Sequence, residues 1–154
     1  MQVLNAVFGG GMTSKLFMNV REKLSLCYSV GSMYYSTKGL ITVSAGVEQC
    51  NVDIARQEIL AQLQACKDED ITDEELAAAK EGVLSALRTV HDSPGAIEGY
   101  YAIAALSGLT IGPQVHEQMI GAVTKEDVAR VAKTLFYHSS FVLKAFPRGE
   151  GGRA

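Results

Sequence analysis

Several features that mark special classes of protein are scarce in this sequence of 154 residues. It contains no tryptophan, three prolines and three cysteines, and no two cysteines form a C-x-x-C pair. So few cysteines exclude a disulfide scaffold, and reduced thiols in a cytoplasm are the simplest interpretation. No apolar run approaches the roughly 18 residues that cross a bilayer, and the first residues lack the charged region of a signal peptide. We therefore expect a cytoplasmic protein that does not contact a membrane.

A surplus of basic residues is also missing. Lys and Arg total 14 and Asp and Glu total 17, so the formal net charge at pH 7 is -3. Nucleic-acid-binding domains normally carry a basic patch or a pI above about 9, and we expect no nucleic-acid partner. Hydrophobic residues make up 47% of the chain, which is ordinary for a globular protein, and the length is that of one domain.

The first half of the chain predicts two helical pieces and then a hairpin. Apolar spacing indicates a helix, or a short strand, over residues 3–8, which three consecutive glycines end. A second helix fits residues 13–23. Alternation of period two then predicts strands over residues 28–36 and 40–47, joined by a turn. The core-facing residues of the second strand are expected to be Ile41, Val43, Ala45 and Val47.

The second half is mainly helical. Three helices are expected to begin at residues whose hydroxyl groups can cap them: Thr72, Ser93 and Thr124. Alternation at Phe141, Leu143 and Ala145 predicts a last strand, which Pro147 ends.

This order of elements predicts an α+β fold with helices packed on one face of a small, largely antiparallel sheet. Because three strands are few for so many helices, we expect a strand to be missing. Residues 1–147 are predicted to form the domain, and the glycine-rich residues 148–154 a disordered tail.

The glycine run at residues 9–11 fits no nucleotide-binding motif. A dinucleotide fingerprint needs glycine at position 14, which is Ser14, and a phosphate loop needs Gly-Lys-Ser/Thr where this chain has Ser14-Lys15-Leu16. A tight connection between two helices, using glycine's tolerance of positive φ, is the better interpretation.

The histidines form no recognisable metal motif. His116-Glu117 begins like H-E-x-x-H, but Ile120 occupies the position of the second histidine. The inverted order H-x-x-E-H fits none of the three histidines. Catalytic zinc needs about three protein ligands and an open position, so we expect no metal bound by this chain itself.

One segment carries a specific resemblance. Residues 4–17 read LNAVFGGGMTSKLF, residues 20–23 read VREK, and residues 26–30 read LCYSV. This pattern resembles the C-terminal domain, which lacks the metal, of the pitrilysin, insulinase and mitochondrial processing peptidase family. These are zinc metallopeptidases of the inverted H-x-x-E-H type. The resemblance extends over nearly the whole chain, to about residue 146, and its N-terminal part is the specific portion.

The resemblance implies functional roles for Arg21 and Tyr28. In that family an Arg and a Tyr seven positions later reach across to the catalytic domain, and these two residues match the spacing. Arg21 would bind backbone oxygens of a peptide substrate, and Tyr28 would both bind substrate and act as a catalytic donor to the developing oxyanion. Zinc is expected in the partner domain, and this chain alone is expected to be inactive.

Two alternatives remain open beside a site-completing domain of a peptide-cleaving enzyme. Relatives also serve as non-catalytic structural or partner-binding subunits, and an unrelated α+β binding module is the third hypothesis. The expected partners are a zinc-bearing homologous domain or subunit, in cis or in trans, and a peptide substrate.

The chain departs from the family pattern at two places. Ser25 stands where many members carry glycine, which a loop can tolerate. The second departure is that the zinc-bearing half of the family is absent and that the strand which normally opens this domain is expected to be missing too, so the chain resembles a fragment of a longer protein. A sheet without that strand has a vacant edge, and vacant edges are templates for pairing. We therefore also expect self-association through the open sheet edge.

Overall fold

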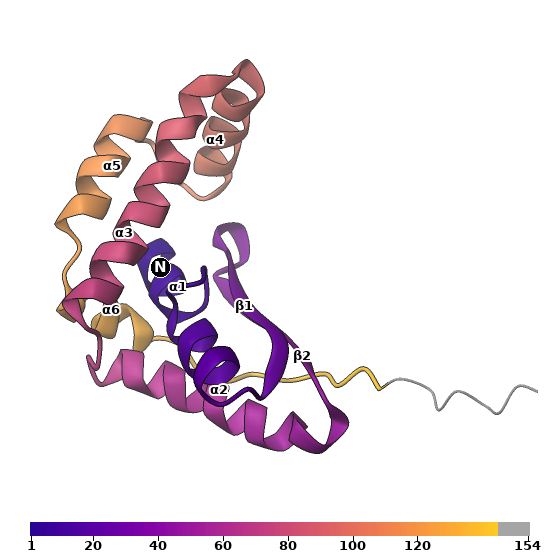
Figure 1. Cartoon of the computed structure of the whole chain (residues 1–154). Helices are drawn as coiled ribbons and strands as arrows, with labels where there is room; N and C mark the ends of the chain where they lie inside the picture. Colours follow the sequence, from indigo (N-terminus) through magenta and orange to yellow (C-terminus); the bar gives the residue numbers. More distant parts are fainter. Residues whose placement is uncertain (145–154) are drawn as a thin grey trace, which may run out of the picture.

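The computed structural model describes residues 1–144. Over this range the chain forms six α-helices, an eight-residue π-helix, short 3-10 turns and one antiparallel hairpin (Figure 1). Helices pack on one face of the hairpin, which confirms the predicted α+β class. None of the helices in these residues is both long enough and apolar enough to span a bilayer.

Helix α1 (Gln2–Phe8) forms the centre of the core. All four of its large apolar side chains, Val3, Leu4, Val7 and Phe8, are buried. The helix contacts α3 (Asp73–Arg88) and α6 (Lys125–Ala132) as well as the hairpin, and it lies between α3 and the hairpin in Figure 1. Because these four side chains are packed inside the core, most of this short helix is apolar.

Gly9 ends α1 at a close approach to the hairpin. Its carbonyl oxygen accepts a hydrogen bond from the Ser32 N–H at 2.8 Å. A Cβ atom at Gly9 would come within 2.7 Å of both Leu16 Cδ1 and Ser32 Oγ. Its φ is -157°, so the glycine is required by crowding here. The positive φ expected for the glycine run is therefore wrong at this position.

The hairpin consists of β1 (Cys27–Tyr35) and β2 (Leu40–Val47). A 3-10 turn, η2 (Ser36–Lys38), and Gly39 at φ 59° connect the strands. Ile41, Val43 and Val47 pack against the core as predicted. Ala45 is exposed, which corrects the prediction for that residue: it alternates with Ile41 and Val43, but its single methyl group offers little apolar surface to bury.

Three of the remaining helices begin at the hydroxyl caps that the sequence predicted. The Thr72 and Ser93 side chains accept from backbone N–H groups at the starts of α3 and α4 (Pro94–Leu106). Thr124 does the same for α6, in a reciprocal capping box with Asp127. The other helices are α2 (Val52–Lys67) and α5 (Pro113–Ala122), with the 3-10 turns η3 (Gln49–Asn51) before α2 and η4 (Thr89–Asp92) before α4.

The predicted last strand is not formed in the part that the structure describes. Residues 141–144 have no secondary structure, and the side chains of Phe141 and Leu143 are 95% and 101% exposed. A strand needs a neighbour for its backbone N–H and C=O groups, and no strand within residues 1–144 pairs with this segment. Ala145, Pro147, the predicted domain end and the predicted tail 148–154 lie outside the described residues.

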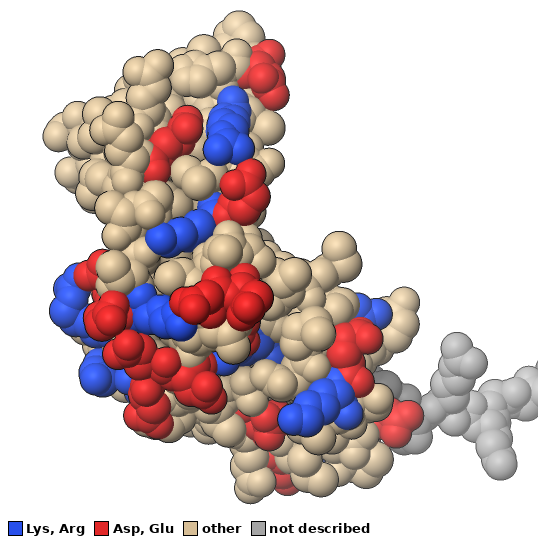
Figure 2. Space-filling view, turned by 60° about the vertical axis from the view of Figure 1, so that its left-hand side comes forward, with Lys and Arg blue, Asp and Glu red and all other residues tan. Residues whose placement is uncertain are grey.

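Two regions can be distinguished in Figure 1. The first, which we call the central region, contains α1, the hairpin, α2, α6 and the first half of α3. The second, which we call the arm, comprises residues 89–122 with η4, α4 and α5, and packs on the second half of α3. On the face in Figure 2, acidic and basic residues are interspersed without a continuous basic surface.

Candidate functional site

Arg21 is carried by a π-helix, η1 (Leu16–Lys23). The Leu24 N–H donates to the Asn19 carbonyl at 3.1 Å, five residues back, whereas the sequence predicted an ordinary helix here. A spacing of four residues places the fully buried Leu16 and Val20 on one face in either kind of helix, so the apolar pattern could not distinguish them. π-Helical turns occur frequently at functional sites.

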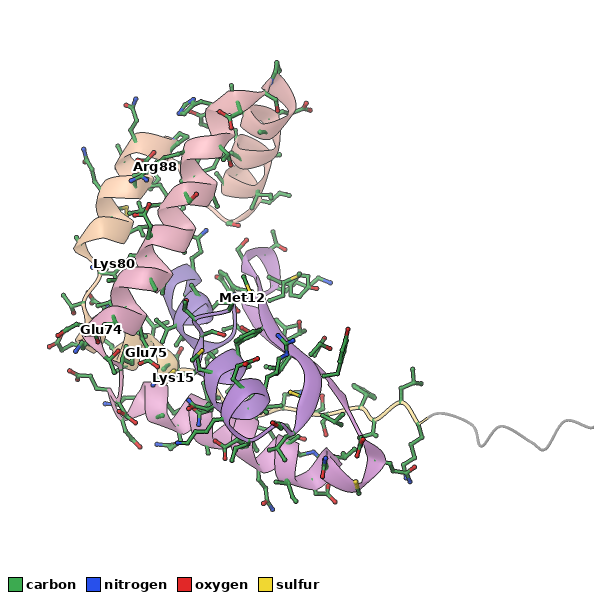
Figure 3. The ribbon with its side chains drawn as sticks, viewed as in Figure 1. Met12, Lys15, Glu74, Glu75, Lys80 and Arg88 are labelled. Atoms are coloured by element: carbon green, nitrogen blue, oxygen red, sulfur yellow. The ribbon has the colours of Figure 1, made fainter. Side chains whose placement is uncertain are left out.

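A buried ion pair fixes the start of η1. Lys15 is only 5% exposed, and its Nζ lies 3.0 Å from each oxygen of the Glu75 carboxylate (Figure 3). One of those oxygens, Oε2, also accepts from the Thr72 N–H at 2.9 Å, within the capping box of α3. Glu75 therefore joins the first turn of α3 to the helix that carries Arg21. The partners are sixty residues apart, and nothing in the sequence pattern predicted this contact.

A second polar contact holds η1 from the other side. The Asn19 Nδ2 donates to Gln62 Oε1 of α2 at 2.7 Å. With Leu16 and Val20 buried below, the π-helix is fixed to α2, to α3 and to the core. Groups held in this way lose little conformational entropy when they bind a ligand.

The Arg21 side chain is oriented but remains accessible. Its guanidinium carbon lies 4.7 Å from the centroid of the Phe17 ring, within the range of a cation–π interaction. Its Nε is 3.7 Å from Glu22 Oε1, and the side chain is 39% exposed. The guanidinium can therefore offer donors to a ligand such as a peptide carbonyl.

Tyr28 occupies a β-bulge at the start of β1. Cys27 pairs with Val47, and Ser29 pairs with Gly46. The chain thus advances by two residues along β1 but by one residue along β2, and Tyr28 has no partner in β2. The side chain is 88% exposed. Bulges of this kind are common next to active sites, where they redirect a side chain. The predicted site residue is thus presented to solvent.

The turn between these two residues is strained. Ser25 has φ 50°, a left-handed conformation that is unfavourable for residues other than glycine. Its N–H donates to the Arg21 carbonyl at 3.0 Å. The departure from the family's glycine therefore falls where glycine would be favoured.

Two opposing effects act on the pKa of the Cys27 thiol, at the start of β1. Burial raises the pKa of the Cys27 thiol, and the positive charge of Arg21 opposes that rise. Arg21 and Cys27 lie at the two ends of the turn that joins η1 to β1. The two predicted residues do not line one cavity, however: Tyr28 borders an opening of about 580 Å³, and Phe17, beneath Arg21, borders another of about 580 Å³.

Within residues 1–144, no three His, Cys, Asp or Glu side chains converge as a metal site would require. His116, the residue of the broken H-E-x-x-H pattern, is buried in the arm, with Nδ1 3.3 Å from the Tyr100 hydroxyl.

Comparison with known proteins identifies the family to which this chain belongs. The sequence pattern described as the peptidase M16 inactive domain matches residues 1–83, which include Arg21, Tyr28 and Glu75. The chain belongs to this family. The resemblance inferred from the sequence is thereby confirmed.

M16-like relatives extend the similarity over most of the chain. A probable inactive metalloprotease of Bacillus subtilis is 36% identical over 145 residues, covering 94% of this chain and 34% of the relative. An uncharacterized zinc protease of Rickettsia felis is 30% identical over 142 residues, covering 88% of this chain and 33% of that protein. The chain thus spans about a third of the length of these curated relatives.

Solved structures share the fold. A conserved protein from Enterococcus faecalis superposes with a TM-score of 0.80 at 30% identity, over 86% of this chain and 31% of its own. A protease from Helicobacter pylori gives a TM-score of 0.74 at 21% identity, over 86% of this chain and 33% of its own.

Proposed function

We propose that this chain is the substrate-binding and site-completing domain of an M16-type zinc metallopeptidase that hydrolyses peptides. Arg21 and Tyr28 act on substrate held against a zinc site in another domain or subunit. Within the cell the proposal assigns the protein to the cytoplasm, where its three free thiols stay reduced.

The observation that carries the proposal is the presentation of Tyr28. A tyrosine that is 88% exposed at a bulge contributes little to the core. Its exposed hydroxyl can donate a hydrogen bond to a ligand. In peptide hydrolysis such a donor stabilises negative charge on the carbonyl oxygen in the transition state.

Arg21 complements that donor. Its planar guanidinium suits the carbonyl oxygens of an extended peptide, and the stacking on Phe17 limits the positions that it can adopt. Zinc in the companion would supply an activated water molecule. This chain would contribute binding, orientation and one oxyanion donor.

The test is Tyr28→Phe in the chain assembled with its zinc-bearing companion. Loss of one oxyanion donor lowers kcat by roughly 10²–10³, so we expect that loss with an unchanged melting temperature. Tyr137→Phe is the control, because this exposed tyrosine bonds Ser140 locally and lies outside the proposed site. If Tyr28→Phe keeps kcat within about threefold, the catalytic role of Tyr28 is excluded.

Arg21 is tested separately by Arg21→Lys. Lysine keeps the charge but loses the planar donor set, so we expect a higher KM, a lower kcat, or both. The matched control is Arg88→Lys, at a surface arginine paired with Glu81 in α3. Equal kinetics for the two variants would leave Arg21 as a structural residue.

A second function has its own support. The matching family is described as inactive, and the Bacillus subtilis relative is named a probable inactive metalloprotease. The chain would then be a non-catalytic subunit that binds a partner. This alternative predicts that the companion-bound assembly cleaves no peptide yet still forms a stable complex, which analytical ultracentrifugation with a peptidase assay distinguishes.

A further inference from the structure

Helix α4 has the sequence of a covered helix but lies on the surface. Glu98 is its one charged residue, and Ala104 is its one buried residue. Four large apolar side chains of the helix are between 37% and 76% exposed: Ile97, Tyr101, Ile103 and Leu106. Helices that are apolar on every side are normally buried. The sequence of α4 therefore fits a helix with a partner, although residues 1–144 leave most of it exposed.

Glu98, Ala102 and Leu106 form what we call the outer face of α4. They follow one another at intervals of four residues, so they share one side of the helix. With about 3.6 residues per turn, Leu106 lies opposite the buried Ala104. All three residues are exposed, and α4 lies at the upper edge of the molecule in Figure 1. The outer face thus combines apolar surface with one carboxylate.

The arm that contains α4 is acidic as well as apolar. Residues 89–122 include Asp92, Glu98 and Glu117 but no Lys or Arg. With histidine neutral, the arm carries a formal charge of -3, which equals the net charge of the whole chain. Two such arms would repel each other, whereas basic residues would be attracted. Charge complementarity thus favours a partner with Lys or Arg around an apolar patch over a second copy of this chain.

The relatives show how much protein accompanies a domain of this kind. This chain covers 34% of the Bacillus subtilis relative and 33% of the Rickettsia felis relative. About two thirds of a protein of that length therefore lies outside the aligned region. A companion of that size can contact the arm as well as the proposed site.

The outer face is distant from the proposed catalytic pair. The Ser107 hydroxyl, at the end of α4, donates to the Ser36 hydroxyl at the tip of the hairpin at 3.0 Å. Tyr28 lies at the opposite end of β1 from Tyr35, which precedes that tip. At 3.3 Å per residue these two tyrosines are about 23 Å apart. Substitutions on α4 should therefore leave the geometry around Tyr28 unchanged.

We propose that the outer face of α4 is a docking surface for the zinc-bearing companion, which meets it with an apolar patch bordered by Lys or Arg. The inference rests on the proposed function and adds where, and through what chemistry, the companion binds. Ala102 and Leu106 would pack against apolar side chains of the companion. The Glu98 carboxylate would accept a charge-assisted hydrogen bond from a basic side chain at the border.

Hydrogen exchange of the α4 amides tests the inference, in the chain alone and in its assembly with the companion. Because α4 has few buried contacts, its amides should exchange rapidly in the chain alone. We expect exchange over residues 94–106 to be at least about tenfold slower in the assembly, because docking suppresses this local opening. Amides of the buried helix α1 exchange through global unfolding and report any general stabilisation. If α4 slows no more than α1 does, the docking surface is overturned.

Two pairs of variants locate the contact on the outer face. Leu106→Gln should return α4 exchange in the assembly to within about threefold of the chain alone, as expected for a central interface residue. Ile54→Gln, at a 54% exposed residue of α2, is the matched control and should keep the slowing. Glu98→Lys should reduce the slowing by at least about threefold through like-charge repulsion, whereas Glu74→Lys, at an exposed residue of α3, should not. Equal exchange within either pair overturns the proposal.

This measurement separates the docking surface from the proposed function. If the assembly cleaves no peptide, slowed exchange of α4 still supports docking while the catalytic proposal fails. Tyr28→Phe should keep the slowing, because Tyr28 lies at the far end of the hairpin. An assembly that cleaves peptide but leaves α4 exchanging as in the chain alone overturns the docking surface. Slowing that develops in the chain alone as its concentration rises would identify a second copy as the occupant, and it also overturns the inference.

Discussion

The central region and the arm bury their side chains very differently. Helix α1 buries four of its seven residues, whereas α4, thirteen residues long and mostly apolar, buries Ala104 alone. Ile103 and Leu106 of α4 are 56% and 76% exposed. Elements with few buried apolar contacts open locally at low free energy. The arm should therefore open before the central region does.

The polar contacts of the two regions follow the same division. The central region contains a buried pair of opposite charges, Lys15 and Glu75, which holds the helix of Arg21. The arm contains a neutral contact, in which the Tyr100 hydroxyl donates to the Ile111 carbonyl at 3.2 Å and lies 3.3 Å from His116. Arg21 and Tyr28 are attached to the firmly held region, so opening of the arm should leave them in place.

The largest expected effect is a difference between two leucines. Leu4→Ala removes a side chain that is 1% exposed at the centre of the core, and we expect a loss of about 3–5 kcal/mol in the free energy of unfolding. Leu106→Ala, at a residue that is 76% exposed in the arm, should cost about 0.5 kcal/mol or less. Urea unfolding measures both. Similar losses would show that the arm is as firmly packed as the core.

Breaking the buried ion pair is the next largest effect. Glu75→Gln leaves the Lys15 charge without its partner, and removal of one partner of a buried pair is strongly destabilising. Since Glu75 is partly exposed, we expect a loss of about 2 kcal/mol, below the range for full burial. Glu74→Gln, at the exposed neighbouring residue, should change stability by about 0.5 kcal/mol or less. Equal effects of these two variants would mean that the pair does not hold η1.

The features that the sequence predicted correctly are those that depend on residues close together in the chain. The caps at Thr72, Ser93 and Thr124 and the alternation of the hairpin each depend on residues within a few positions, and the structure confirms them. The Lys15–Glu75 pair and the opening beside Tyr28 join segments distant in the sequence, and no spacing rule reaches them. The strand at Phe141 and Leu143 was wrong for a related reason: alternation gives the preference for a strand, but pairing needs a neighbour.

The candidate site shows the same limit. The spacing of Arg21 and Tyr28 came from a resemblance, and their roles stay predictions. The bulge that exposes Tyr28 and the π-helix beneath Arg21 are backbone irregularities. Hydrophobic periodicity averages over such features, so it predicted regular elements at both positions.

A smaller effect is the pH dependence of the free energy of unfolding, to which a buried histidine in the arm contributes. Burial lowers the pKa of His116 in the folded arm, whereas the unfolded chain has a histidine pKa near 6.5. The unfolded state therefore binds the proton more readily, and the stability contributed above about pH 6.5 is lost as the pH falls below it. The free energy of unfolding should decline from pH 7.5 to pH 5.5, and His116→Gln should flatten that decline. His91→Gln, at an exposed histidine, is the control; if both variants give the same slope, His116 is not responsible.

The smallest effect concerns the turn that joins the two proposed site residues. Ser25 has φ 50°, and a left-handed conformation costs a residue other than glycine roughly 1–2 kcal/mol. Glycine removes that cost but has a more flexible unfolded chain, which offsets about 0.5–1 kcal/mol. Ser25→Gly should therefore stabilise the protein by about 0.5 kcal/mol. Gly39→Ala, in the hairpin turn at φ 59° with open space around a Cβ, should instead destabilise it by about 1 kcal/mol. Both values come from the same urea titrations. A loss of stability in Ser25→Gly beside the expected loss in Gly39→Ala would show that the Ser25 side chain makes a stabilising contribution larger than the strain.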